Sequence, residues 1–290
     1  MTPLDRVYAY ARLVRIDKPI GALLLLWPTL WALWLSSDGD PQWKVVGIFV
    51  AGTFLMRSAG CAINDYADRN FDPHVKRTEQ RPLAAGVINP GEAVMVAAVL
   101  SIIAFVLVLQ LNTLTVALSF VALFLAASYP FTKRFLRLPQ AYLGVAFGFG
   151  MPMAYAAQTG NVPWIAGALL LANVFWAIAY DTEYAMVDRD DDVKLGIRTS
   201  AILFGRYDVV MVMVFHGLFV LTLAVVGWTT GLGSNFAAGL LLTTVLAAWQ
   251  YRWIRDRSRD GCFRAFRHNN WVGGVAFTAI VVDYGLPPVF

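Results

Sequence analysis

The chain has 290 residues, of which 58% are hydrophobic and only 14% are charged, and its formal net charge at pH 7 is +4. A soluble domain of this size would carry about 25% charged residues, which excludes an ordinary soluble protein. The positive balance does not indicate a nucleic-acid partner, because the basic residues fall between apolar segments in a pattern that membrane topology explains.

The N-terminal segment 1–18 is predicted to form a helix that lies on the membrane surface. Its apolar residues Leu4, Val7, Ala11 and Val14 recur at helical spacing, and arginines stand between them. This pattern is typical of an interfacial amphipathic helix. The apolar run that follows is too long for a signal peptide and lacks a small-residue cleavage site, so we interpret it as a retained first span.

Apolar runs long enough to cross a bilayer as helices then recur along nearly the whole chain. We therefore expect an all-α, polytopic membrane protein with about nine transmembrane helices in a single domain over 1–290. Clusters of Asn, Pro and Gly separate the runs. The predicted spans are 19–35, 44–64, 92–110, 112–129, 139–158, 163–180, 207–228, 235–253 and 270–288.

The distribution of Lys and Arg orients these spans. If the N-terminus and every second loop face one side, that side holds 21 of the 23 Lys and Arg residues. Of the other two, Lys44 faces the opposite side and Arg57 lies within the second span. The positive-inside rule assigns the basic side to the cytoplasm, which predicts a cytoplasmic N-terminus and an outside C-terminus.

Two predicted cytoplasmic loops, 65–91 and 181–206, are longer than a connection requires and are rich in both acidic and basic residues. Such loops are usually functional or disordered, and neither has the Ser and Gly repeats of a disordered segment. At the start of the first, N-D-Y-A-D-R-N-F-D places Asn64, Asp68 and Asp72 at i, i+4 and i+8. On a continuous helix these three side chains would share one face.

The second loop repeats this acidic signature. D-R-D-D-D over 188–192 matches D-R-N-F-D over 68–72. Each motif follows an even-numbered span, and a polar residue precedes each, Asn64 in one case and Asp181 in the other. Ionisable groups this close to a bilayer are costly and usually functional, so the repetition argues against a merely solvated helix end.

Paired carboxylates beside basic residues predict a site for a metal-bound diphosphate. Mg²⁺ takes oxygen ligands and is commonly held by one or two carboxylates together with substrate phosphates. Metal and basic side chains would stabilise the charge that develops as diphosphate leaves a carbon atom. Basic residues follow both motifs, namely Lys76, Arg77 and Arg81 after the first and Lys194 and Arg198 after the second.

Further candidates lie outside these two loops. Arg57 stands seven residues before Asn64 and on the same helical face, so it is either a snorkelling or Asp-paired arginine or an anion receptor at the base of a cavity. The third predicted cytoplasmic loop carries Tyr129, Lys133 and Arg134. The positive-inside rule would explain the charge of that loop without any site.

The sequence resembles the UbiA family of intramembrane prenyltransferases over essentially its whole length. The resemblance rests on N-D-x-x-D-x-x-x-D over 64–72, continued by H-V-K-R-T-E-Q-R-P-L-A-A-G, and on D-R-D-D-D-V-K-x-G-I over 188–197. The segment 15–34, which begins R-I-D-K-P-I-G, is similar to the branch that prenylates 4-hydroxybenzoate in bacterial ubiquinone synthesis.

The resemblance implies helices around a central cavity in the bacterial inner membrane, with the two acidic loops as a cytoplasmic cap. It implies that Asn64, Asp68 and Asp72 form one site for Mg²⁺ and diphosphate and that Asp188 and Asp192 form the other. The four aspartates are the implied catalytic residues. The other implied substrate-binding residues are the Y-x-x-x-K pair Tyr129 and Lys133, the diphosphate contacts Arg77, Arg81 and Lys194, and Arg134 as a candidate for the aromatic carboxylate.

The implied reaction is an electrophilic aromatic substitution between polyprenyl diphosphate and 4-hydroxybenzoate. Mg²⁺-assisted loss of diphosphate gives a cation-like allylic carbon, which the ring carbon ortho to the phenol hydroxyl attacks before a proton leaves. The protein supplies positioning and the exclusion of water, and the lipid bilayer suits the isoprenoid tail. Neither the prenyl chain length nor an oligomeric state follows from the sequence.

Other functions are open at this point. One is a UbiA-family enzyme with another acceptor, such as dihydroxynaphthoate, homogentisate or haem. A CDP-alcohol phosphotransferase would need D-x-x-D-G-x-x-A-R, whose Gly and Ala-Arg are missing here. A cation-coupled transporter would carry acids near the bilayer midplane in broken helices, whereas these acids cluster at one membrane face.

Overall fold

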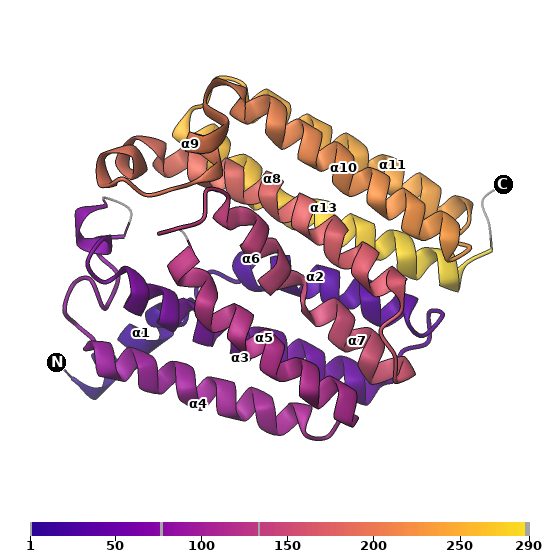
Figure 1. The fold of residues 1–290 in the computed structure, drawn as a ribbon, viewed down its shortest axis with the longest axis horizontal. Helices are drawn as coiled ribbons and strands as arrows, with labels where there is room; N and C mark the ends of the chain where they lie inside the picture. Colours follow the sequence, from indigo (N-terminus) through magenta and orange to yellow (C-terminus); the bar gives the residue numbers. More distant parts are fainter. Residues whose placement is uncertain (1, 76–77, 133, 288–290) are drawn as a thin grey trace.

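Figure 1 shows the computed structural model, which describes residues 2–75, 78–132 and 134–287. Every regular element in these ranges is helical, as the sequence predicts. The α-helices are α1 (Pro3–Leu13), α2 (Ile20–Leu35), α3 (Trp43–Asp68), α4 (Pro90–Val108), α5 (Thr113–Thr132), α6 (Pro139–Gly148), α7 (Gly150–Thr159), α8 (Trp164–Leu195), α9 (Ser200–Phe204), α10 (Asp208–Thr229), α11 (Ser234–Trp249), α12 (Tyr251–Ile254) and α13 (Arg259–Gly285). The short 3-10 helices are η1 (Asp72–His74) and η2 (Gly205–Tyr207).

The long helices have the length and composition of membrane spans. Within the described residues, five segments are long and apolar enough to cross a membrane: Trp43–Asp68, Pro90–Val108, Thr113–Thr132, Trp164–Lys194 and Ser200–Thr229. Helices also cover the other predicted spans, but the count of nine stays a prediction. Only 17% of the apolar window of α4, and of that of α5, is buried, so most of their apolar side chains are accessible, either on the outside of the bundle, where lipid would cover them, or toward its central space.

Exposed tryptophans mark the ends of three long helices. Trp43 begins α3, Trp164 begins α8 and Trp228 lies in the last turn of α10, and their exposed fractions are 72%, 61% and 83%. Trp is enriched where a membrane meets water. α1 begins at one end of the helix bundle and α13 ends at the other (Figure 1), and which end faces the cytoplasm stays a prediction.

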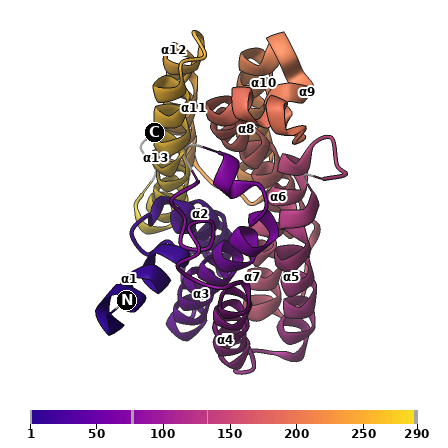
Figure 2. The same ribbon diagram turned by 90° about the vertical axis from the view of Figure 1, so that its left-hand side faces the viewer.

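The helices surround a central space in a closed arrangement. α3 packs on α4, α8 packs on α6 and α10, and α11 packs on α13. α2 contacts α3, α7 and α13, and Figure 2 shows it between the N-terminal and the C-terminal helices. The inner helix α2 therefore joins the two halves of the chain.

The predicted span 139–158 is wrong as a single helix. α6 ends at Gly148 and α7 begins at Gly150. Pro152 causes the interruption, because its ring carries no N–H and crowds the carbonyl group four residues earlier. Glycine at position 150 also lets α2 approach, since a Cβ atom there would meet the Thr29 hydroxyl at 2.6 Å.

The predicted loop 181–206 is wrong over its first part. α8 continues without a break to Leu195, and Gly196 then caps it with a left-handed φ of +66°. No Pro or Gly interrupts 181–195. The second acidic motif therefore lies on the extension of a membrane helix.

Three aromatic rings form the centre of the core. The ring centroid of Trp31 on α2 lies 5.5 Å from that of Trp176 on α8 and 5.8 Å from that of Phe219 on α10. All three side chains are fully buried. Trp31 Nε1 also donates a hydrogen bond to the carbonyl oxygen of Gly273 on α13 at 3.1 Å, so four helices meet at this point.

We expect Trp31→Ala to lower the free energy of unfolding by about 3–5 kcal/mol, because the substitution leaves a void where the three rings meet. Trp228→Ala is the matched control, since that side chain is 83% exposed and its loss should change stability by no more than about 0.5 kcal/mol. Equilibrium unfolding in mixed micelles measures both values. Equal losses in the two variants would contradict this description of the core.

Candidate active site

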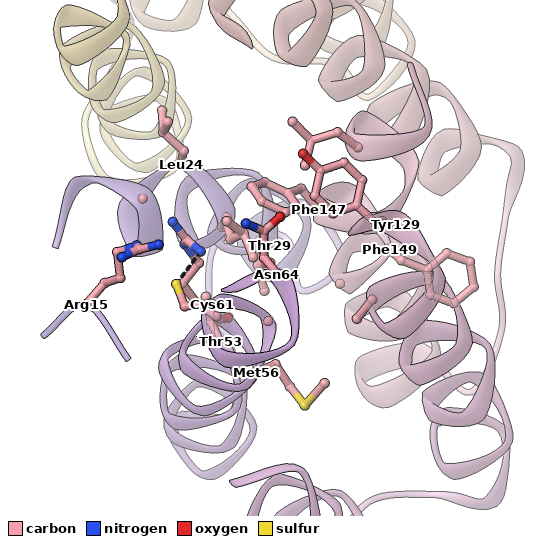
Figure 3. Close-up of a pocket in the computed structure, with 18 of the residues that line it drawn as sticks. Arg15, Leu24, Thr29, Thr53, Met56, Cys61, Asn64, Tyr129, Phe147 and Phe149 are labelled. Atoms are coloured by element: carbon pink, nitrogen blue, oxygen red, sulfur yellow. Dashed lines mark hydrogen bonds between the residues drawn. The ribbon is translucent and has the colours of Figure 1, made fainter. Parts of the chain in front are cut away.

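One large cavity enters the helix bundle. Its volume is about 1180 Å³, and residues of α2 to α8 and of α13 line it. Arg15, Asn64 and Tyr129 lie around this space in Figure 3. Part of its wall is apolar, with Ile102, Phe105, Val108, Phe120 and Leu123 from α4 and α5. The charged residues that line it are Arg15, Asp17, Lys18, Arg57, Arg81, Asp181, Arg259, Asp260 and Arg267. Such a space fits an elongated apolar ligand with an anionic head group.

A chain of ion pairs connects three segments at the mouth of the cavity. Asp65 of α3 is fully buried, and its Oδ1 accepts hydrogen bonds from Arg15 Nη2 at 2.7 Å and from Arg81 Nη1 at 3.1 Å. Arg81 Nη1 also donates to Asp72 Oδ2 at 2.8 Å. We call Arg15, Asp65, Arg81 and Asp72 the ion-pair chain. Because both arginines line the cavity, Asp65 fixes two cations at its mouth.

Two members of the ion-pair chain had no role in the sequence-based prediction. Arg15 lies between α1 and α2 with a left-handed φ of +58°, a conformation that the sequence does not signal and that persists where surrounding contacts hold it. Asp65 adjoins Asn64 in the first acidic motif, and only the long-range contact with Arg15 reveals its role. Residues far apart in the chain thus meet at one carboxylate.

The first acidic motif does not share one helical face. α3 ends at Asp68, and Asp72 lies in η1, so the chain does not form the continuous helix on which the three side chains would share one face. Pro73 is incompatible with a continued α-helix, because it has no N–H and its ring would crowd the carbonyl group of Arg69, four residues earlier. Asn64 still reaches Asp68, with Nδ2 donating to Oδ2 at 3.3 Å. Burial raises the pKa of Asp72, an effect that the neighbouring charge of Arg81 opposes.

The second acidic motif lies on the last turns of α8. Asp188 is buried and Asp192 is half-buried. Between them, Arg189 Nη1 donates to Oδ2 of Asp208 at 2.8 Å. Asp208 is fully buried at the start of α10 and also accepts a hydrogen bond from Arg257 Nε at 2.9 Å. Asp208 therefore holds the acidic end of α8 in place.

Asp181 lies closer to the cavity than either predicted aspartate of the second motif. It lines the cavity, as does Asn64, whereas Asp188 and Asp192 are not among the described lining residues. The sequence indicated that Asp181 could lie at the cavity, because Asp181 precedes the second motif as Asn64 precedes the first. Two oxygen-bearing side chains from α3 and α8 thus line the same space.

Of the other predicted substrate-binding residues, Arg57 and Tyr129 line the cavity. Arg57 Nη1 donates to Sγ of Cys61 at 2.6 Å, which orients the guanidinium along α3. Arg134 is not among the described residues of the cavity wall. Its Nη2 instead donates to the carbonyl oxygen of Ala67 at 2.6 Å. Its predicted contact with a substrate carboxylate therefore has no support from this geometry.

Four predicted contacts stay predictions. Lys76, Arg77 and Lys133 lie outside the described residues. Lys194 is exposed in the last turn of α8, where a cation favours the helix dipole.

The oxygen donors at the cavity mouth fit Mg²⁺ that is shared with phosphate. In the described part of the chain, no group of three or more His, Cys, Asp or Glu side chains can hold a metal ion by itself. Mg²⁺, however, keeps water molecules and is usually bound through one or two carboxylates and substrate phosphates. Asn64 on α3 and Asp181 on α8 line the cavity, and Asp68 adjoins them through the hydrogen bond that it accepts from Asn64, so no nitrogen or sulfur ligand is needed.

Comparison with known proteins identifies relatives over nearly the whole chain. The model of the UbiA prenyltransferase family matches residues 25–280. A protein of Burkholderia vietnamiensis named 4-hydroxybenzoate octaprenyltransferase is 61% identical over 281 residues, covering 97% of each chain. A protein of the same name from Nitrosomonas europaea is 60% identical over 283 residues, covering 98% of this chain and 97% of its own.

Solved structures have the same fold. A UbiA homologue from Aeropyrum pernix is 25% identical with a TM-score of 0.79, covering 90% of this chain and 97% of its own. A UbiA homologue from Archaeoglobus fulgidus bound to GPP and Mg²⁺ is 16% identical with a TM-score of 0.70, covering 96% of this chain and 100% of its own. The helical architecture described above is therefore that of a known membrane-protein fold.

We expect Asp65→Asn to weaken the binding of inorganic diphosphate with Mg²⁺ about tenfold, because Arg15 and Arg81 lose the carboxylate that holds them at the mouth. Asp17→Asn is the matched control, since Asp17 lines the same mouth but is exposed. The loss of a negative charge alone would strengthen anion binding in both variants. Isothermal titration of the purified proteins with diphosphate and Mg²⁺ measures these affinities. Tighter binding by Asp65→Asn would contradict the positioning role of Asp65.

Proposed function

Because the chain belongs to the UbiA prenyltransferase family, we propose that it transfers a polyprenyl group to 4-hydroxybenzoate in ubiquinone biosynthesis. The donor is a polyprenyl diphosphate, the new bond forms at the ring carbon ortho to the phenol hydroxyl, and diphosphate is released. The observation that carries this proposal is the cavity, whose apolar wall and charged mouth suit the two parts of that donor.

The charged mouth binds the diphosphate in this proposal. Arg15 and Arg81, held by Asp65, donate hydrogen bonds to the outer phosphate oxygens. Asn64, Asp68 and the acidic residues of α8 would hold Mg²⁺, which would supply positive charge to stabilise the departing diphosphate. Asp68, Asp72, Asp188 and Asp192 keep the catalytic roles that the sequence predicts for them, with Asp181 added from its place in the cavity wall.

The apolar wall serves the chemistry by keeping water from the reacting carbon. A cation-like allylic centre would be captured by water in an open site, so a dry cavity determines which nucleophile reaches it. Tyr129 and Phe147 lie with ring centroids 6.1 Å apart in this wall, and aromatic faces attract positive charge. The prenyl tail extends between the apolar residues of α4 and α5.

Arg57 is the better candidate for the carboxylate of 4-hydroxybenzoate. It lines the cavity, whereas Arg134 donates to the backbone of Ala67. A guanidinium matches the geometry of a carboxylate and keeps its charge in an apolar environment. The aromatic acceptor would then lie with its carboxylate directed away from the acidic motifs, which avoids repulsion between like charges.

The site also fits a location in the bacterial inner membrane. Basic residues at the N-terminal end favour a cytoplasmic cavity mouth, where a water-soluble aromatic acid can enter. The polyprenyl donor reaches the same cavity while its tail stays in the apolar phase. The membrane therefore brings together two substrates of very different solubility.

We expect Asp68→Ala to lower Mg²⁺-dependent transfer of a labelled prenyl group to 4-hydroxybenzoate by about 10²–10³-fold, because the leaving group loses metal-borne charge. Asp190→Ala is the control, since Asp190 lies in the second motif but is exposed, with 78% of its side chain accessible. It should keep nearly full activity. Washed membranes that carry each variant provide the assay, and full activity of Asp68→Ala would overturn the mechanism.

The identity of the acceptor is tested in the same membranes. We expect transfer to 4-hydroxybenzoate and little to 1,4-dihydroxy-2-naphthoate or homogentisate, because only the first presents a carboxylate para to its hydroxyl. Product formation from the naphthoate alone would keep the chain in its family but assign another acceptor.

We expect Arg57→Met to raise the KM for 4-hydroxybenzoate about 10–100-fold, because a charge-assisted hydrogen bond is lost. The KM for the prenyl diphosphate should change little. Arg134→Met is the matched arginine outside the cavity wall, and it should leave the KM for 4-hydroxybenzoate unchanged. The reverse result would assign the carboxylate to Arg134.

A further inference from the structure

The Tyr180 hydroxyl is a buried polar group at the cavity without a partner. The residue is 1% exposed and lines the cavity, and its hydroxyl oxygen has no hydrogen-bond partner among the described residues. A buried hydroxyl that bonds to nothing destabilises the folded state. Its presence is explained if a ligand in the cavity supplies the missing partner.

A polar network behind the cavity wall fixes the ring of Tyr180. The ring meets Trp176 edge to face, with centroids 5.2 Å apart and planes at 84°. Trp176 Nε1 donates to Oδ1 of Asn269 at 2.9 Å, and Asn269 Nδ2 donates to Oε2 of Glu183 at 2.8 Å. Trp176, Glu183 and Asn269 are all fully buried. The hydroxyl of Tyr180 is therefore held on a ring that packing and hydrogen bonds immobilise.

Charges of both signs surround this hydroxyl. Asp181 and Arg57 lie close enough to interact electrostatically with Tyr180, and the same two residues act on the Tyr129 hydroxyl. All four residues line the cavity. Tyr180 thus lies between the acidic groups of α8 and the arginine that we assign to the acceptor carboxylate.

The chemistry of the reaction determines which end of the acceptor lies near Tyr180. The attacked ring carbon is ortho to the phenol hydroxyl, so this hydroxyl must lie beside the allylic carbon and its diphosphate. The diphosphate binds near the acidic motifs, and Tyr180 immediately precedes Asp181. The carboxylate, para to the hydroxyl, then points away from the diphosphate.

We propose that the Tyr180 hydroxyl forms a hydrogen bond with the phenol hydroxyl of 4-hydroxybenzoate and thereby selects hydroxylated aromatic acids. This inference rests on the proposed function. A phenol can both donate and accept a hydrogen bond, so the pair satisfies two polar groups at once. A site that pairs with a substrate hydroxyl rejects an analogue without it, because its own polar group is then left unpaired.

Binding of 4-hydroxybenzoate and of benzoate, which lacks the hydroxyl, tests the pair directly. For the wild type we expect about tenfold tighter binding of 4-hydroxybenzoate, equivalent to about 1.4 kcal/mol. Tyr180→Phe should bind both acids equally, with benzoate affinity unchanged. Tyr155→Phe is the control, since Tyr155 is also buried, at 5% exposure, but is not among the described lining residues, and it should keep the tenfold preference.

Thermal unfolding without ligand supplies a second readout. Tyr180→Phe should leave Tm unchanged or raise it by a few degrees, because the deleted hydroxyl had no partner to lose. A lower Tm would show that the hydroxyl serves the fold and would overturn the proposal. So would a preference for 4-hydroxybenzoate that persists in Tyr180→Phe or is absent from the wild type. The proposed function fails separately, if wild-type membranes do not prenylate 4-hydroxybenzoate.

Discussion

The buried carboxylate of Asp65 is the contact on which the charged mouth of the cavity depends. It receives Arg15 from the segment before α2 and Arg81 from the segment before α4, and Arg81 continues to Asp72. Without these arginines, the first acidic motif would bring several like charges into a poorly solvated place, which is costly. With them, cations remain at the cavity, where an anionic head group can use their other donors.

A similar arrangement of charges holds the acidic end of α8. Asp208 is buried between Arg189 of the acidic motif and Arg257, which precedes α13. Asp65 and Asp208 are not among the proposed metal and substrate ligands, but each holds an arginine. Arg81, held by Asp65, also pairs with Asp72. Arg189, held by Asp208, follows Asp188 in the chain. The charged region therefore has two kinds of carboxylate, those that we propose to bind metal and substrate and those, Asp65 and Asp208, that position the protein's own cations.

Much of the architecture could be predicted from the sequence, because apolar length and the distribution of Lys and Arg follow from the bilayer itself. The helical spacing of Arg57 to Asn64 gave a place at the cavity as one of two interpretations. The extension of α8 to Leu195 was not predicted. The acidic run was interpreted as the end of the helix, although Gly196 is the first residue that breaks it. The partners of Asp65 and the missing partner of the Tyr180 hydroxyl depend on long-range packing, which no local pattern in one sequence contains.

The cavity joins these observations into the proposed mechanism, in which its apolar wall keeps water from the reactive carbon and its charged residues anchor the leaving group. An experimental structure with Mg²⁺, 4-hydroxybenzoate and a thio-diphosphate analogue of the donor tests this claim most directly. The account predicts the diphosphate analogue within hydrogen-bond distance of Arg81 and beside Asn64 and Asp181, with the prenyl tail between α4 and α5. A head group bound away from these residues, or a tail outside the cavity, would contradict it.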